Sequence, residues 1–182
     1  MMRSGCASRN RSTIFCGGAN TDTADYSYLA TGFTATLVST GTATVTAAAG
    51  DTDILALVEN IIGGSGADTL VGGAGNDTIV GGNDSDSLVG NGGEDSMAGD
   101  AGNDTLVGGD GLDSLAGGAG NDNLSGGDGY DQLYGGSGND RLDSGNSGDD
   151  DLHGNGGANT FVIRDGIANV YLFDVNSDDV ID

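Results

Sequence analysis

Apolar residues recur at every ninth position through the middle of the chain. Between Gly63 and Val162 the sequence divides into nine-residue units such as GGAGNDTIV (72–80), and the eighth residue of each unit is apolar. A fixed period indicates a repeat architecture, in which every unit buries its apolar side chain by stacking on its neighbours. The apolar column consists of Leu70, Ile79, Leu88, Met97, Leu106, Leu115, Leu124, Leu133, Leu142, Leu152 and Phe161.

The other positions of the unit predict a turn followed by a short strand. Position 1 is Gly in every unit, and position 4 is Gly in all of them except where Asp84 stands. Gly permits positive φ and close backbone approach, so GGxGxD is predicted to be a tight turn. The three residues after the Asp, such as 69–71, favour a strand whose central side chain faces inward. The sequence therefore predicts an all-β, flattened solenoid with two nonapeptide repeats per coil.

Position 6 carries a carboxylate in every unit but the last, where Asn159 stands. Alternate units lie on the same side of the roll, so two files of Asp are expected: Asp68, Asp86, Asp104, Asp122 and Asp140 in one, and Asp77, Asp95, Asp113, Asp131 and Asp150 in the other. Stacked about 4.8 Å apart, these carboxylates repel one another unless cations lie between them. Ca²⁺ takes oxygen ligands from carboxylates and carbonyls in flexible loops, so multiple Ca²⁺ ions are predicted. Asn159 and an inserted residue, Ser144, are expected to weaken the sites near the C-terminal end.

The repeat GGxGxDxUx, contiguous over residues 63–162, resembles that of the RTX (repeats-in-toxin, haemolysin-type) calcium-binding family. The resemblance implies a right-handed parallel β-roll with Ca²⁺ between successive turns on the same side. It also implies that the ligands are the position-6 carboxylates and the backbone carbonyls of the turns. The metal-binding residues carried over in this way are Gly66, Asp68, Gly75, Asp77, Asp86, Gly93, Asp95, Gly102, Asp104, Gly111, Asp113, Gly120, Asp122, Gly129, Asp131, Gly138, Asp140, Gly148 and Asp150.

The composition favours cations as partners. The chain has 28 Asp and Glu against 5 Lys and Arg, a net charge of −23, and it contains no Pro or Trp. This balance argues against nucleic acid and anionic membrane surfaces as partners. The burial of the apolar column is small beside the conformational entropy lost on ordering about 100 Gly-rich residues, so the repeats are predicted to be largely disordered without Ca²⁺. No apolar stretch is long enough for a transmembrane helix.

The regions flanking the repeats are predicted to cap the roll. Residues 1–16 are expected to be disordered, 17–62 to form an irregular β-solenoid cap, and 163–182 to form a C-terminal cap. A separate small β-domain is the alternative for 17–62. Within this segment GGANTD (17–22) resembles a degenerate turn with Asp22 at the ligand position. Asp174, Asn176 and Asp178 have the spacing of an EF-hand loop, but the capping interpretation is preferred because the turn Gly is missing. Cys6 and Cys16 leave both a small disulfide and two free thiols open.

No catalytic constellation is found, so the chain is predicted not to be an enzyme. The single histidine, His153, falls at an outward position and is expected to be solvated. Proteins of the resembled family are exported by type I systems, which makes a secretion apparatus an expected partner and an extracellular location the expected one. Two alternatives stay open: the C-terminal folding domain of a larger secreted protease, lipase or epimerase, and an adhesin or ice- or sugar-binding module that uses a file of position-7 hydroxyls.

Overall fold

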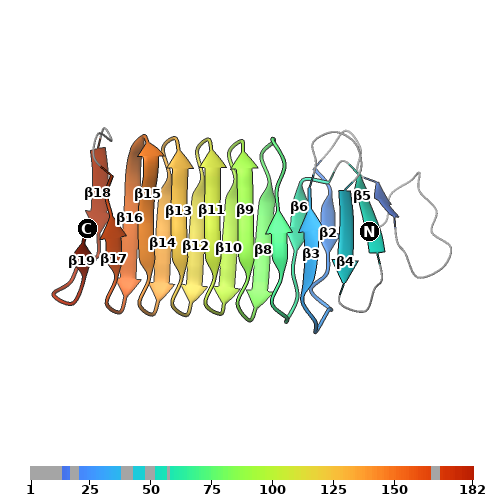
Figure 1. Cartoon of the computed structure of the whole chain (residues 1–182), viewed down its shortest axis with the longest axis horizontal. Helices are drawn as coiled ribbons and strands as arrows, with labels where there is room; N and C mark the ends of the chain where they lie inside the picture. The colour runs from blue at the N-terminus through green and yellow to red at the C-terminus, as the bar shows by residue number, and fades with distance from the viewer. Residues whose placement is uncertain (1–13, 17–20, 38–42, 48–51, 57, 165–168) are drawn as a thin grey trace.

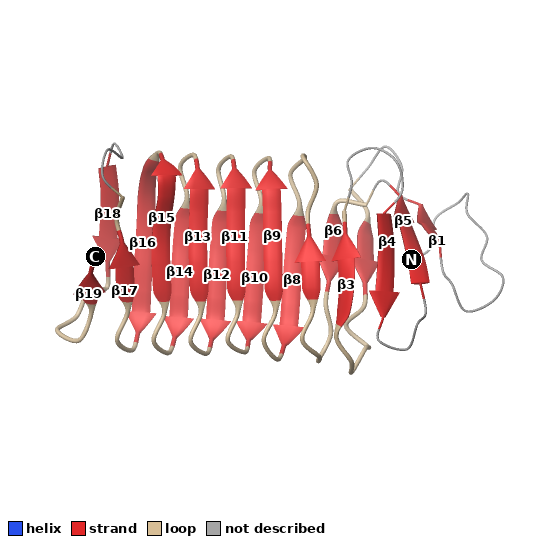
Figure 2. Cartoon of the chain, viewed as in Figure 1, coloured by secondary structure: helices blue, strands red, loops and turns tan. Residues whose placement is uncertain are grey.

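The strands stack into one continuous roll. The computed structural model describes residues 14–16, 21–37, 43–47, 52–56, 58–164 and 169–182. Within these residues the chain is a parallel β-solenoid of about seven turns with two sheets and no helix (Figure 2). The coils follow one another along the long axis, from the N-terminal strands at one end to the C-terminal strands at the other (Figure 1). The predicted all-β solenoid is confirmed.

Each sheet collects every second strand of the repeats. The eleven-stranded sheet, in spatial order, contains β1 (Ile14–Cys16), β5 (Thr52–Ala56), β4 (Ala43–Ala47), β3 (Phe33–Thr36), β7 (Thr69–Val71), β9 (Ser87–Gly92), β11 (Thr105–Asp110), β13 (Asn123–Asp128), β15 (Arg141–Ser147), β17 (Thr160–Val162) and β19 (Val180–Ile181). The eight-stranded sheet contains β18 (Asn169–Phe173), β16 (Asp149–Gly156), β14 (Gln132–Ser137), β12 (Ser114–Ala119), β10 (Ser96–Ala101), β8 (Thr78–Asn83), β6 (Asn60–Ile62) and β2 (Thr23–Asp25).

The strand register confirms two nonapeptides per coil. Ser96 pairs with Ser114 across β10 and β12, and Thr105 pairs with Asn123 across β11 and β13, so paired residues are one coil of eighteen residues apart. All the strand pairs are parallel except β3–β4 and β4–β5, which are antiparallel and lie in the part of the chain before the repeats. Identical positions of the repeat are therefore neighbours along each sheet.

The strands of the regular coils are longer than the sequence predicts. β12 runs for six residues, because it continues from positions 7–9 through the first three positions of the next unit. A side chain at position 1 would be crowded in the regular coils, since a Cβ on Gly117 would lie 2.4 Å from Oδ2 of Asp122, and one on Gly126 would lie 2.3 Å from Oδ2 of Asp131. The turn proper is confined to positions 4–6, where Gly120 has a φ of 140° that L side chains rarely adopt.

The predicted apolar column forms the core between the two sheets. All eleven position-8 side chains are buried, with exposures of 0–2%. Ala24, Ala35 and Ile61 continue the column towards the N-terminal end, where they are also fully buried. At the C-terminal end Ile181 is in register with Phe161 but 57% exposed. The column is therefore covered at the N-terminal side and open at the C-terminal side.

The inserted residue of the tenth unit is Asn146, not Ser144. β13 and β15 pair Gly127 with Gly145 and then Asp128 with Ser147, so the register slips within this step. The carbonyl oxygen of Ser144 lies 2.8 Å from a Cβ built on Gly126, just as that of Gly126 lies 2.5 Å from a Cβ built on Gly108. Ser144 thus stands at position 1, and the prediction that it is the inserted residue is wrong.

The segments outside the repeats join the same sheets. β2, β3 and β6 run parallel to the repeat strands, and β18 and β19 are the edge strands at the C-terminal end. The segment predicted to be disordered, 1–16, lies outside the described residues except for Ile14–Cys16, which form β1. Cys6 also lies outside the described residues, as do residues 17–20 of the degenerate turn.

Candidate metal centre

Buried carboxylates run along both edges of the roll, just before each repeat strand. Every position-6 Asp has an exposure of 6% or less, and from Asp86 onwards its Oδ1 accepts the backbone N–H of the position-6 Asp one coil earlier. The N–H of Asp86, for example, donates to Oδ1 of Asp104 at 2.8 Å, and that of Asp104 donates to Oδ1 of Asp122 at 2.8 Å. The same contact at the other edge joins Asp95 to Asp113 at 2.9 Å. The two predicted files are thus present as two hydrogen-bonded ladders.

The second oxygen of most of these carboxylates has no partner. Oδ2 of Asp68 and Asp77 accepts a backbone N–H, from Gly64 at 2.9 Å and Gly73 at 2.6 Å respectively. In the later units Oδ2 is buried and accepts no hydrogen bond; these residues are Asp86, Asp95, Asp104, Asp113, Asp122, Asp131, Asp140 and Asp150. A buried acceptor without a partner costs about 1–3 kcal/mol, and more when it is charged. The ladders therefore need a further group that supplies positive charge.

Burial shifts the titration of the ladder carboxylates upward. Desolvation raises the pKa of Asp86 and that of Asp131 to about 7, although a backbone N–H hydrogen bond opposes the shift in each case. Desolvation also raises the pKa of Asp77, Asp104, Asp113 and Asp150 to about 6. Neighbouring carboxylates of the same file add to the shift. Without a counter-ion, the ionised ladder is disfavoured at neutral pH.

No basic side chain among the described residues neutralises the ladders. Arg141 and Arg164 both pair with Asp143, and His153 lies 3.6 Å from Asp174. Neither Asp143 nor Asp174 is a position-6 residue. Compensation of the ladder carboxylates must therefore come from protons or from a cation taken up from solution.

Backbone carbonyls of the turns offer further free oxygens. The position-4 carbonyl oxygens of the central turns accept no hydrogen bond from any described residue; they belong to Gly93, Gly102, Gly111, Gly120, Gly129 and Gly138. These glycines are half-buried, so the turns are reachable from solvent. Each regular turn thus combines one unpartnered carboxylate oxygen with one unpartnered carbonyl oxygen.

This donor set suits a hard cation. No three Asp, Glu, His or Cys side chains converge on one point among the described residues, so a site built mainly from side chains is not found there. Ca²⁺ prefers oxygen ligands and readily takes backbone carbonyls together with a few carboxylates. Soft or nitrogen-seeking metals would need thiolates or several imidazoles. The residues present therefore fit Ca²⁺.

The predicted ligands all lie in these two rows of turns, but Asn159 differs from them. Its Oδ1 accepts the N–H of Asp140 at 2.9 Å, exactly where the next Asp of the file would do so, which leaves Nδ2 buried and without a partner. An amide N–H₂ group at this point presents donors where the other turns present an acceptor. This arrangement supports the expectation that Asn159 weakens cation binding at the last turn.

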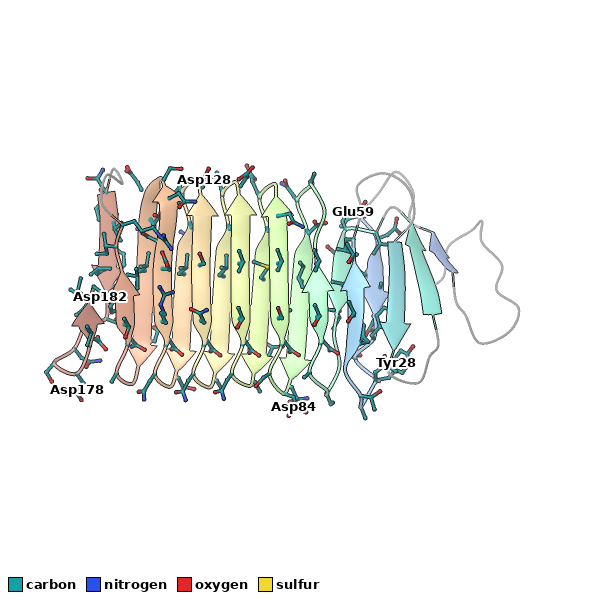
Figure 3. All side chains as sticks on the ribbon, in the orientation of Figure 1. Tyr28, Glu59, Asp84, Asp128, Asp178 and Asp182 are labelled. Atoms are coloured by element: carbon teal, nitrogen blue, oxygen red, sulfur yellow. The ribbon has the colours of Figure 1, made fainter. Side chains whose placement is uncertain are left out.

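Sequence reasoning missed two members of the ladders. Oε2 of Glu59 accepts the N–H of Asp22 at 2.9 Å, and Oδ1 of Asp179 accepts the N–H of Asn159 at 2.6 Å, which is the ladder contact in both cases. Figure 3 places Glu59 at the same edge as Asp128 and opposite Asp84. Glu59 is followed by Asn60-Ile61-Ile62 and Asp179 by Val180-Ile181, so an acid just before a short apolar strand is the signal that identifies them.

The expectation for His153 is corrected, and the EF-hand alternative for the C-terminal loop finds no support. His153 is not freely solvated, because its ring stacks on Tyr134 at 4.7 Å and on Phe173 at 4.3 Å. Asp174 faces His153, while the side-chain amide of Asn176 donates to the carbonyl of Gly157 at 3.0 Å. The residues with EF-hand spacing therefore make separate contacts, and Asp179 is the acid of this loop that joins a ladder.

Comparison with known proteins agrees with this geometry. A family model described as the RTX calcium-binding nonapeptide repeat matches in four copies, over residues 58–88, 89–124, 116–146 and 133–161, which together span more than half of the chain. The matched model is that of a calcium-binding repeat, and no catalytic family is evident. No curated protein matches the chain. Among the described residues there is no helix with the length and apolar character needed to span a membrane.

Proposed function

On the premise that the chain belongs to the family of RTX calcium-binding nonapeptide repeats, we propose that it is a secreted, non-enzymatic β-roll that folds when Ca²⁺ binds in its turns. The observation that carries this proposal is the unpartnered buried Oδ2 in eight successive turns. The position-6 carboxylates and the position-4 carbonyls are the proposed ligands. Bound Ca²⁺ would supply the positive charge that the chain itself lacks at the ladders.

Coupling between folding and binding follows from the energetics of the ladders. Closing the coils brings carboxylates of each file within one strand spacing, and buries them without a basic partner. The apolar column of one side chain per nonapeptide offers little burial to offset this cost. A site that forms only in the folded chain adds its binding free energy to folding. The chain is therefore proposed to be unfolded at low Ca²⁺ and folded at high Ca²⁺.

This coupling supports an extracellular role. A chain that is unfolded at the low Ca²⁺ concentration inside cells can be threaded through a narrow channel, and it then folds where Ca²⁺ is abundant. A type I secretion apparatus is the proposed partner for that step. The use of the roll as the folding domain of a larger secreted enzyme stays a prediction.

The flanking segments are proposed to cap the roll, in line with the division into 17–62 and 163–182. Support comes from ladder contacts at both ends: the N–H of Phe33 donates to Oδ1 of Asp68 at 2.8 Å, and that of Asn159 donates to Asp179. An ice- or sugar-binding face has weaker support, because the file of position-7 hydroxyls is divided between the two sheets. Thr69, Ser87 and Thr105 are paired in one sheet, while Thr78, Ser96 and Ser114 are paired in the other.

A calcium titration tests the proposed function. The full chain is treated with EDTA, exchanged into chelator-free buffer and titrated with CaCl₂, while circular dichroism and isothermal calorimetry follow folding and binding. We expect a disordered spectrum without Ca²⁺, a β spectrum at millimolar Ca²⁺, and several bound ions per chain. MgCl₂ is the matched control, because Mg²⁺ sheds its water reluctantly and is expected to bind poorly. A β spectrum indifferent to EDTA, with no heat of binding, would refute the proposal.

A further inference from the structure

The tenth turn differs from the others in a way that points to an additional ligand. The segment from position 1 to the position-6 Asp contains seven residues in the tenth unit, Ser144 to Asp150. The same segment of a regular unit, such as 117–122, contains six. The extra residue, Asn146, follows Ser144 and Gly145, which keep the places of positions 1 and 2. This is the only turn of the eleven nonapeptides with a side chain at position 1.

The direction of the Ser144 side chain follows from its register. In regular turns a Cβ at position 1 would point at Oδ2 of the position-6 Asp in the same unit, as on Gly63 and Gly72, and it would come closer still on Gly117. Its register therefore places the Cβ of Ser144 on the side of the turn where the carboxylate of Asp150 lies.

Two unpartnered oxygens are buried at this turn. Ser144 and Asp150 are both 0% exposed. Oγ of Ser144 and Oδ2 of Asp150 make no hydrogen bond, either with each other or with any other described group. A buried hydroxyl normally finds a partner, and one that is left without a partner costs about 1–3 kcal/mol. A hard cation between the two oxygens would satisfy both.

We propose that Ser144 Oγ and Asp150 Oδ2 bind the same cation, so that the tenth turn holds its ion with one side-chain ligand more than a regular turn. This inference rests on the proposed function, and it reverses the expectation that the insertion weakens binding. The added hydroxyl is neutral, so it contributes a ligand without adding to the repulsion between Asp150 and its neighbours Asp149 and Asp151. The tenth turn is then the tighter site of its file.

A double-mutant cycle read by calcium calorimetry tests this assignment. CaCl₂ is titrated into the EDTA-treated full chain as wild type, Ser144→Ala, Asp150→Asn and the double variant. Asp150→Asn is expected to remove one binding step, and Ser144→Ala to weaken that same step by about tenfold. The double variant should titrate like Asp150→Asn alone, because both changes act on one ion. Ser114→Ala, which removes a hydroxyl from a position-7 strand residue, is the control that should leave the titration unchanged.

The possible outcomes separate this inference from the proposed function. A wild-type chain that takes up no Ca²⁺ overturns both. A wild-type chain that binds Ca²⁺ normally while Ser144→Ala titrates identically overturns this inference alone. So does a Ser144→Ala effect that persists undiminished in the Asp150→Asn background. Should Ser144→Ala fail to fold in Ca²⁺, Ser144→Gly restores the residue of the other turns, and it must show the same weakened step.

Discussion

Two parts of the roll compensate their buried carboxylates by different means. In the central coils, strands β8–β13, Asp86 is 3% exposed and has no basic partner, and desolvation raises its pKa to about 7. In the C-terminal coils, Asp143 is 2% exposed; burial by itself raises its pKa, but hydrogen bonds from Arg164 and Arg141 bring it below the usual value. These two similarly buried carboxylates therefore have pKa values shifted in opposite directions. Arg141 and Arg164 supply positive charge to Asp143, whereas Asp86 depends on the solution for its counter-charge.

The C-terminal coils also carry contacts that the central coils lack. Tyr134, His153 and Phe173 are neighbours in register on three successive strands, and their rings stack with interplanar angles of 17° and 6°. Arg164 binds both oxygens of Asp143, at 3.0 and 2.8 Å. These contacts tie the last coils together across the strands. The C-terminal coils therefore have contacts within the chain in addition to their ladder carboxylates, whereas the central coils have no such ion cluster or ring stack among the described residues.

The largest expected effect is the loss of central ligands. Asp104→Asn with Asp122→Asn keeps an oxygen for the ladder hydrogen bonds but removes the charge from two adjacent turns. At a Ca²⁺ concentration one hundredfold above Kd, each lost site costs about 2.7 kcal/mol, so the unfolding free energy should fall by about 5 kcal/mol. Thermal unfolding with and without Ca²⁺ measures this.

The matched control for that variant is Asp110→Asn with Asp128→Asn. It makes the same change in net charge at exposed position-3 residues of the central coils. Its stability in Ca²⁺ should stay within about 0.5 kcal/mol of wild type, as is usual for surface substitutions. An equal loss in both double variants would mean that net charge, not ligation, stabilises the central coils.

A smaller and calcium-independent effect is expected at the C-terminal ion cluster. Asp143→Asn removes the charge that binds Arg141 and Arg164, and should cost about 1–3 kcal/mol, because both guanidinium groups are half-exposed. Hydrogen exchange of β15 and β17 should accelerate by a similar factor at low and high Ca²⁺. Acceleration confined to the calcium-loaded chain would show that Asp143 belongs to the metal sites.

Acidification should affect the ladder carboxylates and Asp143 in opposite directions. All ten ladder carboxylates have raised pKa values, and the pKa reaches about 6 to 7, against an ordinary value of 3.8, for Asp77, Asp86, Asp104, Asp113, Asp131 and Asp150. Protonation of these groups therefore favours the metal-free fold. Their contribution is fully present below about pH 3.8 and is lost as the pH rises through 6 to 7. The lowered pKa of Asp143 has the reverse consequence, since its contribution is lost as the pH falls through that lowered value.

The measurement is the β signal of the EDTA-treated chain between pH 7.5 and 4.5, which should rise as the ladders take up protons. The same titration in 1 M NaCl is the control, because salt screens the general repulsion of an acidic chain but not a buried carboxylate. If 1 M NaCl abolished the acid-induced rise in the β signal, the rise would be due to the net charge of the chain and not to the buried carboxylates. Ca²⁺ affinity should fall over the same range, because protons compete for the ligands.

The smallest expected effect concerns the ring stack. Phe173→Ala removes the outer ring against His153 and should cost about 0.5–1.5 kcal/mol, seen as faster hydrogen exchange in β18. Tyr171→Ala on the same strand is the control, because Tyr171 is 50% exposed and belongs to no ring pair. If both variants loosen β18 equally, the stack is not what holds this strand.

The repeated part of the structure follows from the sequence alone. Every nonapeptide stacks on another of the same pattern, so the period predicts the coil of eighteen residues, the buried column from Leu70 to Phe161 and the two files of Asp, with no knowledge of the rest of the chain. The proposed ligands, which the resemblance to the RTX family implies, recur at fixed places of the same period. Because the units repeat, the local sequence pattern is enough to predict how the coils stack.

Only the tertiary structure decided the features in which neighbouring coils differ. These features are the position of Ser144, the ladder contacts of Glu59 and Asp179, the ion pair between Arg164 and Asp143, and the rings stacked on His153. They depend on contacts between residues about 20 or more apart in the chain. Insertions and irregular termini change that spacing from coil to coil, so no period reveals which side chains meet. The strand length belongs here too, because the sequence pattern does not show that β12 continues through Gly117 into the next unit.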